Sequence, residues 1–186
     1  MRIDTFDITA PAISGEAFSE AEALGSAVWL WMHSAAHRDA PLQVLSALLM
    51  PAIKTRQFVI ATEHGKPVFY VAWANMDEAA ETRYINHPPY AMPEADWSCG
   101  ERMWLLDWVA PFGHTHPMSR LFLSQLFPKR WMRALDHRGN ERGLRIKTYR
   151  GIAVMPEEAR HWFNTHPVTL PKASTHQTQA FLQPSR

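Results

Sequence analysis

The sheet of this protein is best located from one octapeptide, Met103-Trp104-Leu105-Leu106-Asp107-Trp108-Val109-Ala110, in which a single carboxylate interrupts apolar side chains. Its length and aromatic content are typical of a strand buried on both faces. Regular strand geometry puts Asp107 on one face with Met103, Leu105 and Val109, and the other four side chains on the opposite face. Burying an unpaired carboxylate is costly, so Asp107 must be hydrogen-bonded or paired with a cation. It is either a structural residue or a functional carboxylate whose pKa is tuned by its surroundings.

The composition predicts a folded protein with a sizeable core. The chain has 186 residues, of which 46% are hydrophobic and eight are tryptophan. No stretch approaches the ~20 consecutive apolar residues of a membrane span, and the first residues carry no visible secretory signal. The single cysteine, Cys99, excludes an intrachain disulfide, so we expect a protein of the reducing cytoplasm.

The net charge of +1 conceals an uneven distribution. Residues 129–150, the basic segment, carry eight Lys or Arg side chains against Asp136 and Glu141, a local excess of six positive charges. Such a segment suits an acidic partner, either nucleic acid or an acidic protein. A solvated face without a partner is the alternative interpretation.

Local patterns predict the other elements. Ser19 and Glu22 have the spacing of a capping box, and apolar residues follow them at helical spacing. A second helix is expected to open between Asp39 and Pro41 and to end near Pro51. The remaining patterns predict, in chain order, a β-hairpin (57–62 and 68–73), a short helix (77–85), a loop (86–100), the strand quoted above, a mainly helical stretch (117–135) with a stop near Pro128, a strand (144–149) and a short helix (156–164).

This order of elements predicts an α/β protein, or α+β by a stricter definition, with helices packed on a mixed sheet. We expect one domain over residues 1–186. Within it, residues 1–20 are expected to form an N-terminal extension and residues 167–186 a polar C-terminal tail.

The strongest catalytic candidate is His37, in the joint between the two predicted helices. An imidazole titrates near neutral pH and can take a proton from an attacking nucleophile. A buried Asp107 would fix its tautomer if the two residues meet in space. A structural or surface histidine is the alternative.

The other candidate site residues have weaker support from the sequence than His37. Cys99 is a candidate nucleophile beside His37, but no thiol-enzyme fingerprint surrounds it. His114 and His116 have a metal-compatible spacing without a third ligand nearby, so no metal site is expected. Trp73 and Trp108 are either core residues or the walls of an acyl-binding slot.

Three segments carry a more specific pattern. They are Trp29-Leu-Trp-Met-His-Ser-Ala-Ala-His37-Arg38-Asp39-Ala-Pro41, Val71-Ala-Trp73-Ala-Asn75 and Cys99-Gly-Glu-Arg-Met-Trp-Leu-Leu-Asp107-Trp-Val-Ala-Pro-Phe112. Over about residues 22–165 the chain resembles the RTX toxin-activating lysine acyltransferases of the hemolysin C type.

The resemblance implies a fold like that of the Gcn5-related N-acetyltransferases, a mixed and largely antiparallel sheet flanked by helices. It implies transfer of a fatty acyl group from acyl carrier protein to the ε-amine of internal lysines in an RTX protoxin. The acyl donor is then a phosphopantetheine thioester, and no tightly bound cofactor is expected. The partners are the carrier protein and the protoxin rather than nucleic acid, and the family tends to dimerise.

The resemblance also assigns residues. The essential histidine of the family falls on His37, the essential aspartate on Asp107, and a serine three residues before the histidine on Ser34. We expect Ser34, Arg38, Trp73 and Trp108 to contact substrate. A lysine amine must lose a proton before it attacks a thioester, so His37 is expected to take that proton while Asp107 orients or charges the ring. An acyl-histidine intermediate is the competing scheme.

The chain departs from the family pattern at four positions. Known members carry Trp at Ala40, Asn at Leu48, Pro at Ala35 and Glu at Thr148. These changes leave two alternatives open: a non-catalytic adaptor or chaperone that binds carrier protein or toxin, and a thioester hydrolase that uses the same His–Asp pair.

Overall fold

A computed structural model describes residues 1–137 and 144–168 of the chain. Seven strands form one sheet whose order in space follows the chain: β1 (Arg2–Ile3), β2 (Phe6–Thr9), β3 (Phe58–Glu63), β4 (Lys66–Met76), β5 (Arg102–Val109), β6 (Trp131–His137) and β7 (Leu144–Arg150). Every neighbouring pair is antiparallel except β5 and β6, which are parallel. The predicted mixed sheet flanked by helices is confirmed.

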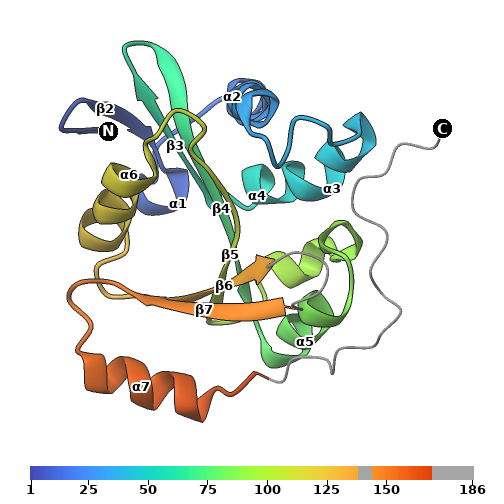
Figure 1. The fold of residues 1–186 in the computed structure, drawn as a ribbon, viewed down its shortest axis with the longest axis vertical. Helices are drawn as coiled ribbons and strands as arrows, with labels where there is room; N and C mark the ends of the chain where they lie inside the picture. The colour runs from blue at the N-terminus through green and yellow to red at the C-terminus, as the bar shows by residue number, and fades with distance from the viewer. Residues whose placement is uncertain (138–143, 169–186) are drawn as a thin grey trace.

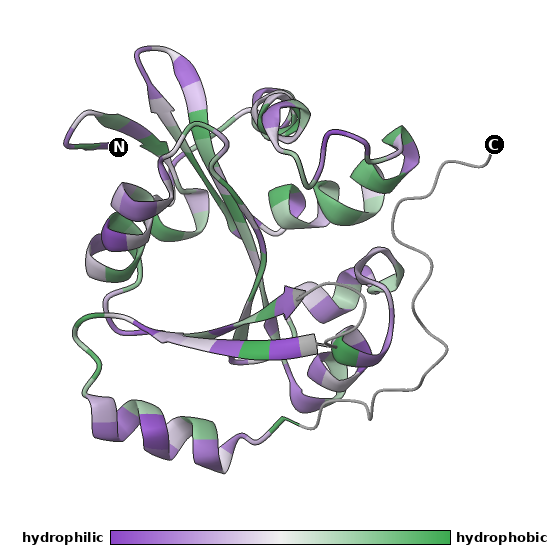
Figure 2. Cartoon of the chain, in the orientation of Figure 1, coloured by the Kyte–Doolittle hydropathy of each residue, from purple (hydrophilic) through white to green (hydrophobic). Residues whose placement is uncertain are grey.

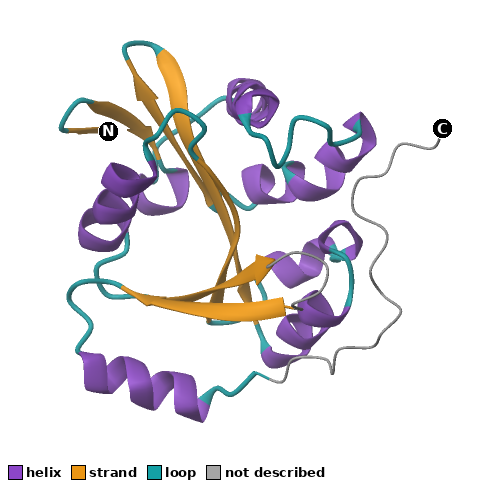
Figure 3. Ribbon diagram, viewed as in Figure 1, coloured by secondary structure: helices purple, strands orange, loops and turns teal. Residues whose placement is uncertain are grey.

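Helices cover both faces of this sheet (Figure 1, Figure 3). One face carries α2 (Glu20–His33), η1 (Leu42–Val44), α3 (Leu45–Leu48), α4 (Met50–Lys54), α5 (Glu78–Asn86), η2 (Pro89–Ala91) and η3 (Glu94–Trp97). The other face carries α6 (Thr115–Leu121) and the π-helical turn η4 (Phe122–Leu126). The short α1 (Pro11–Ser14) follows β2, and α7 (Pro156–Thr165) follows β7. The sheet thus separates two apolar clusters, and its central strands are largely hydrophobic (Figure 2).

Several local predictions are confirmed. The Ser19 hydroxyl accepts a hydrogen bond from the Glu22 amide and caps α2. The hairpin forms as β3 and β4, with His64 and Gly65 at positive φ in its two-residue turn. The predicted helices over 77–85 and 156–164 form as α5 and α7, and the predicted strand over 144–149 forms as β7.

Two predictions of helix extent are wrong in part. The predicted stop near Pro128 is confirmed, since the helical stretch that begins at Thr115 ends at Leu126. Residues 131–135, which the sequence placed in the same mainly helical stretch, belong to β6. Pro51 does not end a helix but lies in the first turn of α4, where its missing amide costs no hydrogen bond.

The predicted N-terminal extension is part of the folded domain. The predicted N-terminal extension contributes β1, β2 and α1, and β2 pairs with β3 through Asp7, Ile8 and Thr9. Phe6 and Ile8 are buried in the cluster under α6. Residues 1–20 therefore include one edge of the sheet. Of the predicted C-terminal tail, residues 169–186 lie outside the described residues.

A β-bulge in β5 corrects the predicted faces of the central strand. Ala72 pairs with Asp107 and Trp73 pairs with Leu105, which leaves Leu106 as the extra residue. Before the bulge, Met103 and Leu105 face the α6 side. After it, Trp108 faces that side, and Asp107 lies on the α2 side with Trp104 and Val109. The alternation predicted from Met103 to Val109 is therefore wrong beyond Leu106.

A buried carboxylate holds the start of β5 to its neighbours. Glu81 of α5, with a side chain 3% exposed, accepts hydrogen bonds from Arg102 and from the Trp104 indole (2.7 Å) of β5, and from Arg133 (2.8 Å) of β6. Burying this carboxylate is tolerated because both of its oxygens are satisfied. The same contacts fix β6 beside β5, where the parallel pairing covers only Trp104 with Arg133 and Leu105 with Ala134.

The core also contains a hydroxyl without a partner. Tyr70 of β4 is fully buried, and among the described residues nothing forms a hydrogen bond with its hydroxyl. Burial, together with the nearby Asp107 carboxylate, raises the pKa of Tyr70 well above its ordinary value. Tyr70 therefore stays protonated in the folded protein at pH values where an exposed tyrosine ionises.

Replacing the buried carboxylate should destabilise the fold strongly. Glu81→Gln removes the charge that compensates Arg133, and we expect it to lower the free energy of unfolding by about 3–5 kcal/mol in urea titrations. Glu78→Gln is the matched control, since Glu78 lies one turn earlier, contacts Arg102 as well and is 80% exposed. Its loss should stay below about 1 kcal/mol. Equal losses in the two variants would contradict the role of Glu81.

Removing the unpartnered hydroxyl should not weaken the fold. Tyr70→Phe deletes a buried polar group, so the free energy of unfolding at about pH 8 should be unchanged or higher by about 1 kcal/mol. Above about pH 10 the wild type should lose stability, because Tyr70 ionises in the unfolded chain before it ionises in the fold. The variant should lose less over the same range. A variant less stable by more than about 1 kcal/mol at pH 8 would instead reveal a partner for the hydroxyl.

Candidate active site

The site is formed where the turn after α2 meets the bulged half of β5. Ser34 ends α2 in an extended conformation, and its carbonyl oxygen accepts from the amides of His37 (3.0 Å) and Arg38 (2.9 Å). This turn carries the His37 ring back to the sheet, where Nε2 lies 3.2 Å from Oδ1 of Asp107. The structure therefore brings together the two residues that the sequence analysis paired.

Asp107 is held from a second direction by Trp31, which lies in the last turns of α2. The Trp31 indole Nε1 donates to Oδ2 of Asp107 at 2.8 Å, while His37 engages the other oxygen. The Trp31 and His37 rings lie 4.8 Å apart between centroids at an angle of 31°. Two partners therefore satisfy a carboxylate whose side chain is only 14% exposed. The His37 side chain is 24% exposed, so the pair is sheltered but reachable.

Ser34 completes a chain of three groups. Its hydroxyl lies 2.8 Å from Nδ1 of His37. An ionised Asp107 can only accept, so Nε2 of a neutral imidazole carries the hydrogen and Nδ1 presents its lone pair. Ser34 then donates to Nδ1. The order hydroxyl, imidazole and carboxylate is that of a proton-transfer triad, with Nδ1 as the basic atom.

Three of the predicted substrate contacts lie elsewhere. Arg38 points into solvent beside Asp39, at 3.7 Å. Trp73 is buried against Phe127 on the α6 side of the sheet, and Trp108 packs there against Phe69 and Phe122. For both tryptophans the core interpretation made from sequence fits this placement, and Trp108 lies on the face opposite Asp107, as the alternation of adjacent strand residues requires.

The other reactive candidates are also separate from this centre. The Cys99 sulfur contacts the Asp77 amide and the Asp96 carbonyl near the end of β4. Nε2 of His114 lies 3.3 Å from Glu63. In the described part of the chain, no group of three or more His, Cys, Asp or Glu side chains is placed to hold a metal ion, and no helix is long and apolar enough to cross a membrane.

The basic segment is less uniformly exposed than its sequence implies. Arg133 is buried against Glu81, and Lys147 pairs with Asp136 at 3.0 Å. Lys129, Arg130 and Arg145 are exposed. Arg138 and Arg142 lie outside the described residues.

Sequence reasoning missed two residues that matter for the site. Trp31 was expected only as part of the apolar stripe of α2, and its role follows from the indole N–H, which needs a partner when buried. Glu81 was not singled out, although an acidic residue among the apolar positions of a predicted helix is a signal that could have found it.

Comparison with known proteins places this geometry in a family. Residues 16–150 match the RTX toxin acyltransferase family. The chain is 32% identical over 169 residues to a protein-lysine myristoyltransferase of Kingella kingae, covering 91% of this chain and 98% of that protein. It is 36% identical over 139 residues to a protein-lysine palmitoyltransferase of Bordetella bronchiseptica, covering 74% and 75%.

Among solved structures, the loading GNATL domain of CurA from Lyngbya majuscula matches with a TM-score of 0.42 and 12% identity, covering 87% of this chain and 84% of that one. The family match spans the turn that carries His37, the bulged strand that carries Asp107 and the helix that carries Glu81. The chain belongs to the RTX toxin acyltransferase family, a family of acyl-transferring enzymes.

Proposed function

We propose that this enzyme transfers a fatty acyl group from acyl carrier protein to the ε-amine of internal lysines of an RTX protoxin, in the cytoplasm. The observation that carries the proposal is the Asp107 carboxylate held between Trp31 and His37 on a sheltered face. The relatives named as protein-lysine myristoyl- and palmitoyltransferases support the acceptor and the acyl group. The resemblance supports the carrier protein as donor.

His37 acts as the general base. A lysine amine is protonated near neutral pH and must lose a proton before its nitrogen can attack a carbonyl carbon. Nδ1 of His37 accepts that proton as the amine displaces the Ser34 hydroxyl from it. The ring becomes positively charged, and Asp107 stabilises the charge across the 3.2 Å contact.

The remaining steps complete the transfer. The amine nitrogen forms a bond to the thioester carbonyl carbon, the nitrogen of the tetrahedral intermediate releases a second proton to water, and the carbon–sulfur bond breaks as the intermediate collapses. The leaving thiolate takes the first proton from His37, which returns to its neutral form. The products are an amide on lysine and the free thiol of the carrier protein.

Two covalent schemes compete with direct transfer. In the first, His37 itself carries the acyl group. In the second, Ser34 attacks the thioester and passes its proton to Nδ1 of His37, an arrangement that the 2.8 Å contact favours. Each scheme leaves an acyl group on a different residue, so intact-protein and peptide mass spectrometry distinguish them.

The departures from the family pattern leave the side chains of the triad unchanged, although Ala35 lies in the turn between Ser34 and His37 and the Ala40 amide donates to the His37 carbonyl oxygen at 2.9 Å. Ala40 and Leu48 are partly buried against the apolar cluster on the α2 side, and Thr148 is exposed on β7. Leu48 makes the cluster beside the site more apolar than asparagine would. This change is better explained by a site that binds a fatty acyl chain than by a protein that has lost its activity.

Removing either member of the pair should abolish transfer. His37→Ala and Asp107→Asn should each lower the rate of acyl transfer from acyl carrier protein to a lysine-containing protoxin segment by roughly 100-fold or more. The measurement is acyl-lysine formation by mass spectrometry. Arg38→Ala is the control, because its side chain neighbours His37 in sequence but points into solvent. It should retain activity within about threefold.

The same assay separates the alternatives. Free fatty acid without acyl-lysine in the wild type would indicate a hydrolase, and carrier binding without turnover would indicate an adaptor. Transfer that survives in His37→Ala at the wild-type rate would refute the proposed base. An acyl group recovered on Ser34 or His37 during turnover would replace direct transfer by the matching covalent scheme.

Exposed charges of the basic segment should bind the acidic carrier protein. Reversing Lys129, Arg130 and Arg145 to Glu should weaken carrier affinity by roughly tenfold at low salt and flatten its salt dependence. Arg2, Arg120 and Arg160 are exposed outside the segment, and their reversal to Glu gives a control with the same change in net charge. Equal weakening in both variants would mean that the carrier responds to net charge rather than to this segment.

A further inference from the structure

We propose that the pocket beside Tyr84 receives the far end of the fatty acyl chain, and that Tyr84 limits the length of chain the enzyme accepts. This inference rests on the proposed function for the nature of the ligand, a fatty acyl thioester. It adds a residue that selects among acyl chains, at some distance from the reacting atoms.

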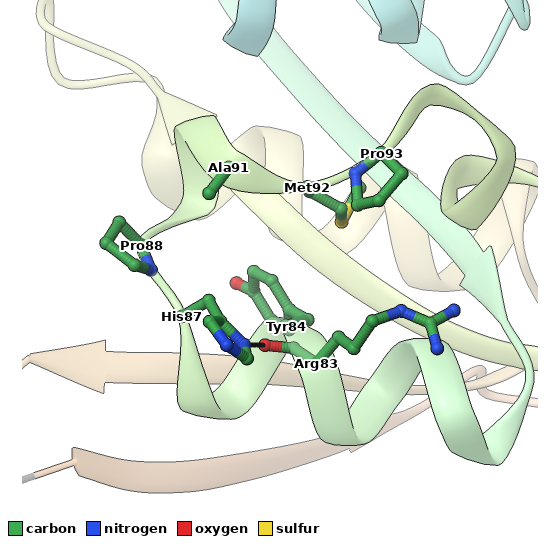
Figure 4. A pocket seen from close by; sticks show the side chains of 7 residues that line it. All are labelled: Arg83, Tyr84, His87, Pro88, Ala91, Met92 and Pro93. Carbon is green, nitrogen blue, oxygen red and sulfur yellow. Dashed lines mark hydrogen bonds between the residues drawn. The ribbon is translucent and has the colours of Figure 1, made fainter.

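The pocket lies between α5 and the segment that follows it. It has a volume of about 150 Å³, and Tyr84 rises from α5 toward Pro88, Ala91, Met92 and Pro93 (Figure 4). These side chains offer an apolar lining. A ligand that enters here gains from leaving water rather than from a specific polar contact.

The two polar side chains at this pocket are already engaged. The Arg83 guanidinium forms two hydrogen bonds with the Asp96 carboxylate, at 2.8 and 2.7 Å. The ring of His87 contacts the Arg83 carbonyl oxygen at 2.9 Å, as Figure 4 shows. Both side chains are thus held by other groups of this chain, and the other five residues that line the pocket are apolar or aromatic. The lining as a whole therefore suits a hydrocarbon better than a headgroup, a phosphate or a peptide carboxylate.

A rigid contact connects the pocket with the catalytic strand. The Tyr84 ring packs edge-on against Trp104, with centroids 5.4 Å apart, and Trp104 is fixed by Glu81 one turn earlier in α5. Because of the bulge, Trp104 shares the face of Asp107, three residues and roughly 10 Å further along β5. Burial, followed by the Asp107 charge, raises the pKa of Tyr84, which agrees with the two groups lying within electrostatic reach.

Partly buried apolar side chains extend the cluster that contains Trp104 and Tyr84. Leu48 of α3, Leu106 of β5 and Met92 all pack against the same cluster as Trp104 and Tyr84, and α3 packs on η2 beside the pocket. Toward α2 the cluster is closed, since Leu30 and Trp31 are buried. In this proposal, an acyl chain whose thioester lies at His37 runs along this cluster toward Met92 and ends at Tyr84.

Chain length is a property on which relatives differ, because one is named a myristoyltransferase and another a palmitoyltransferase. Each methylene removed from water contributes about fourfold to binding, so a side chain that blocks or admits two methylenes changes relative affinity on the order of tenfold. A tyrosine ring at the end of the path can supply that discrimination.

The test measures binding, which does not require turnover. Saturated acyl-pantetheine thioesters that differ by two methylenes displace a fluorescent fatty acid from the full chain, and the length of tightest binding is compared between variants. Tyr84→Ala should shift that optimum to longer chains by two or more methylenes. Ala91→Leu, which fills the pocket from the exposed turn, should shift it to shorter chains. Tyr84→Phe keeps the ring and should keep the wild-type optimum.

The outcomes separate this inference from the proposed function. An unchanged optimum in both Tyr84→Ala and Ala91→Leu would overturn it, as would a wild type that binds all lengths equally. If thermal melting shows that Tyr84→Ala does not fold, the optimum of Ala91→Leu decides alone. Binding with the expected shifts but without transfer from carrier protein would refute the proposed donor and leave the role of Tyr84 standing.

Discussion

One extra residue in β5 determines which face of the sheet carries the carboxylate. Because Leu106 is left out of the pairing with β4, Asp107 points toward α2. There its carboxylate contacts the Trp31 indole and the His37 ring. Without the bulge, the same side chain would point to the opposite face of the sheet, toward the apolar cluster that contains Phe122 and Phe127 and away from Trp31 and His37. Because a buried unpaired charge is so costly, the bulge and the pair must form together. Fold and site therefore depend on the same local irregularity.

The strand that carries this irregularity is anchored at one end and free at the other. Glu81 ties the start of β5 to α5 and β6 through Arg102, Trp104 and Arg133. Beyond Leu105 the pairing with β6 stops, and the two strands separate (Figure 1). The half that bears Asp107 is thus paired only with β4 in the described part of the chain. The anchored start of β5 holds this carboxylate in place, as a site of fixed geometry requires.

The sequence predicts those parts of the fold that depend on residues close together in the chain. The cap at Ser19, the turn at His64 and Gly65 and the apolar run of β5 are all encoded within a few residues. The pairing of His37 with Asp107 came from resemblance, because no local rule joins residues so far apart. The sequence at the bulge contains no glycine or proline that would indicate an irregularity. Regular alternation was therefore expected beyond Leu106, and this expectation placed Asp107 on the wrong face of the sheet. Residues 131–135 were placed in a mainly helical stretch, although they pair along their whole length with β7, the next strand in the chain, and through two residue pairs with β5.

The placement of the pair also explains why a carboxylate can work in so apolar a region. Before proton transfer, the charge of Asp107 is spread over contacts with an indole N–H and an imidazole N–H, both neutral donors. Under the proposed mechanism, the same carboxylate faces a cation at the same 3.2 Å after transfer, and partial burial makes that attraction stronger than it would be in water. The carboxylate therefore supplies a fixed counter-charge to the ring that takes the proton, and an acyl chain bound over the opening would exclude further water from the pair.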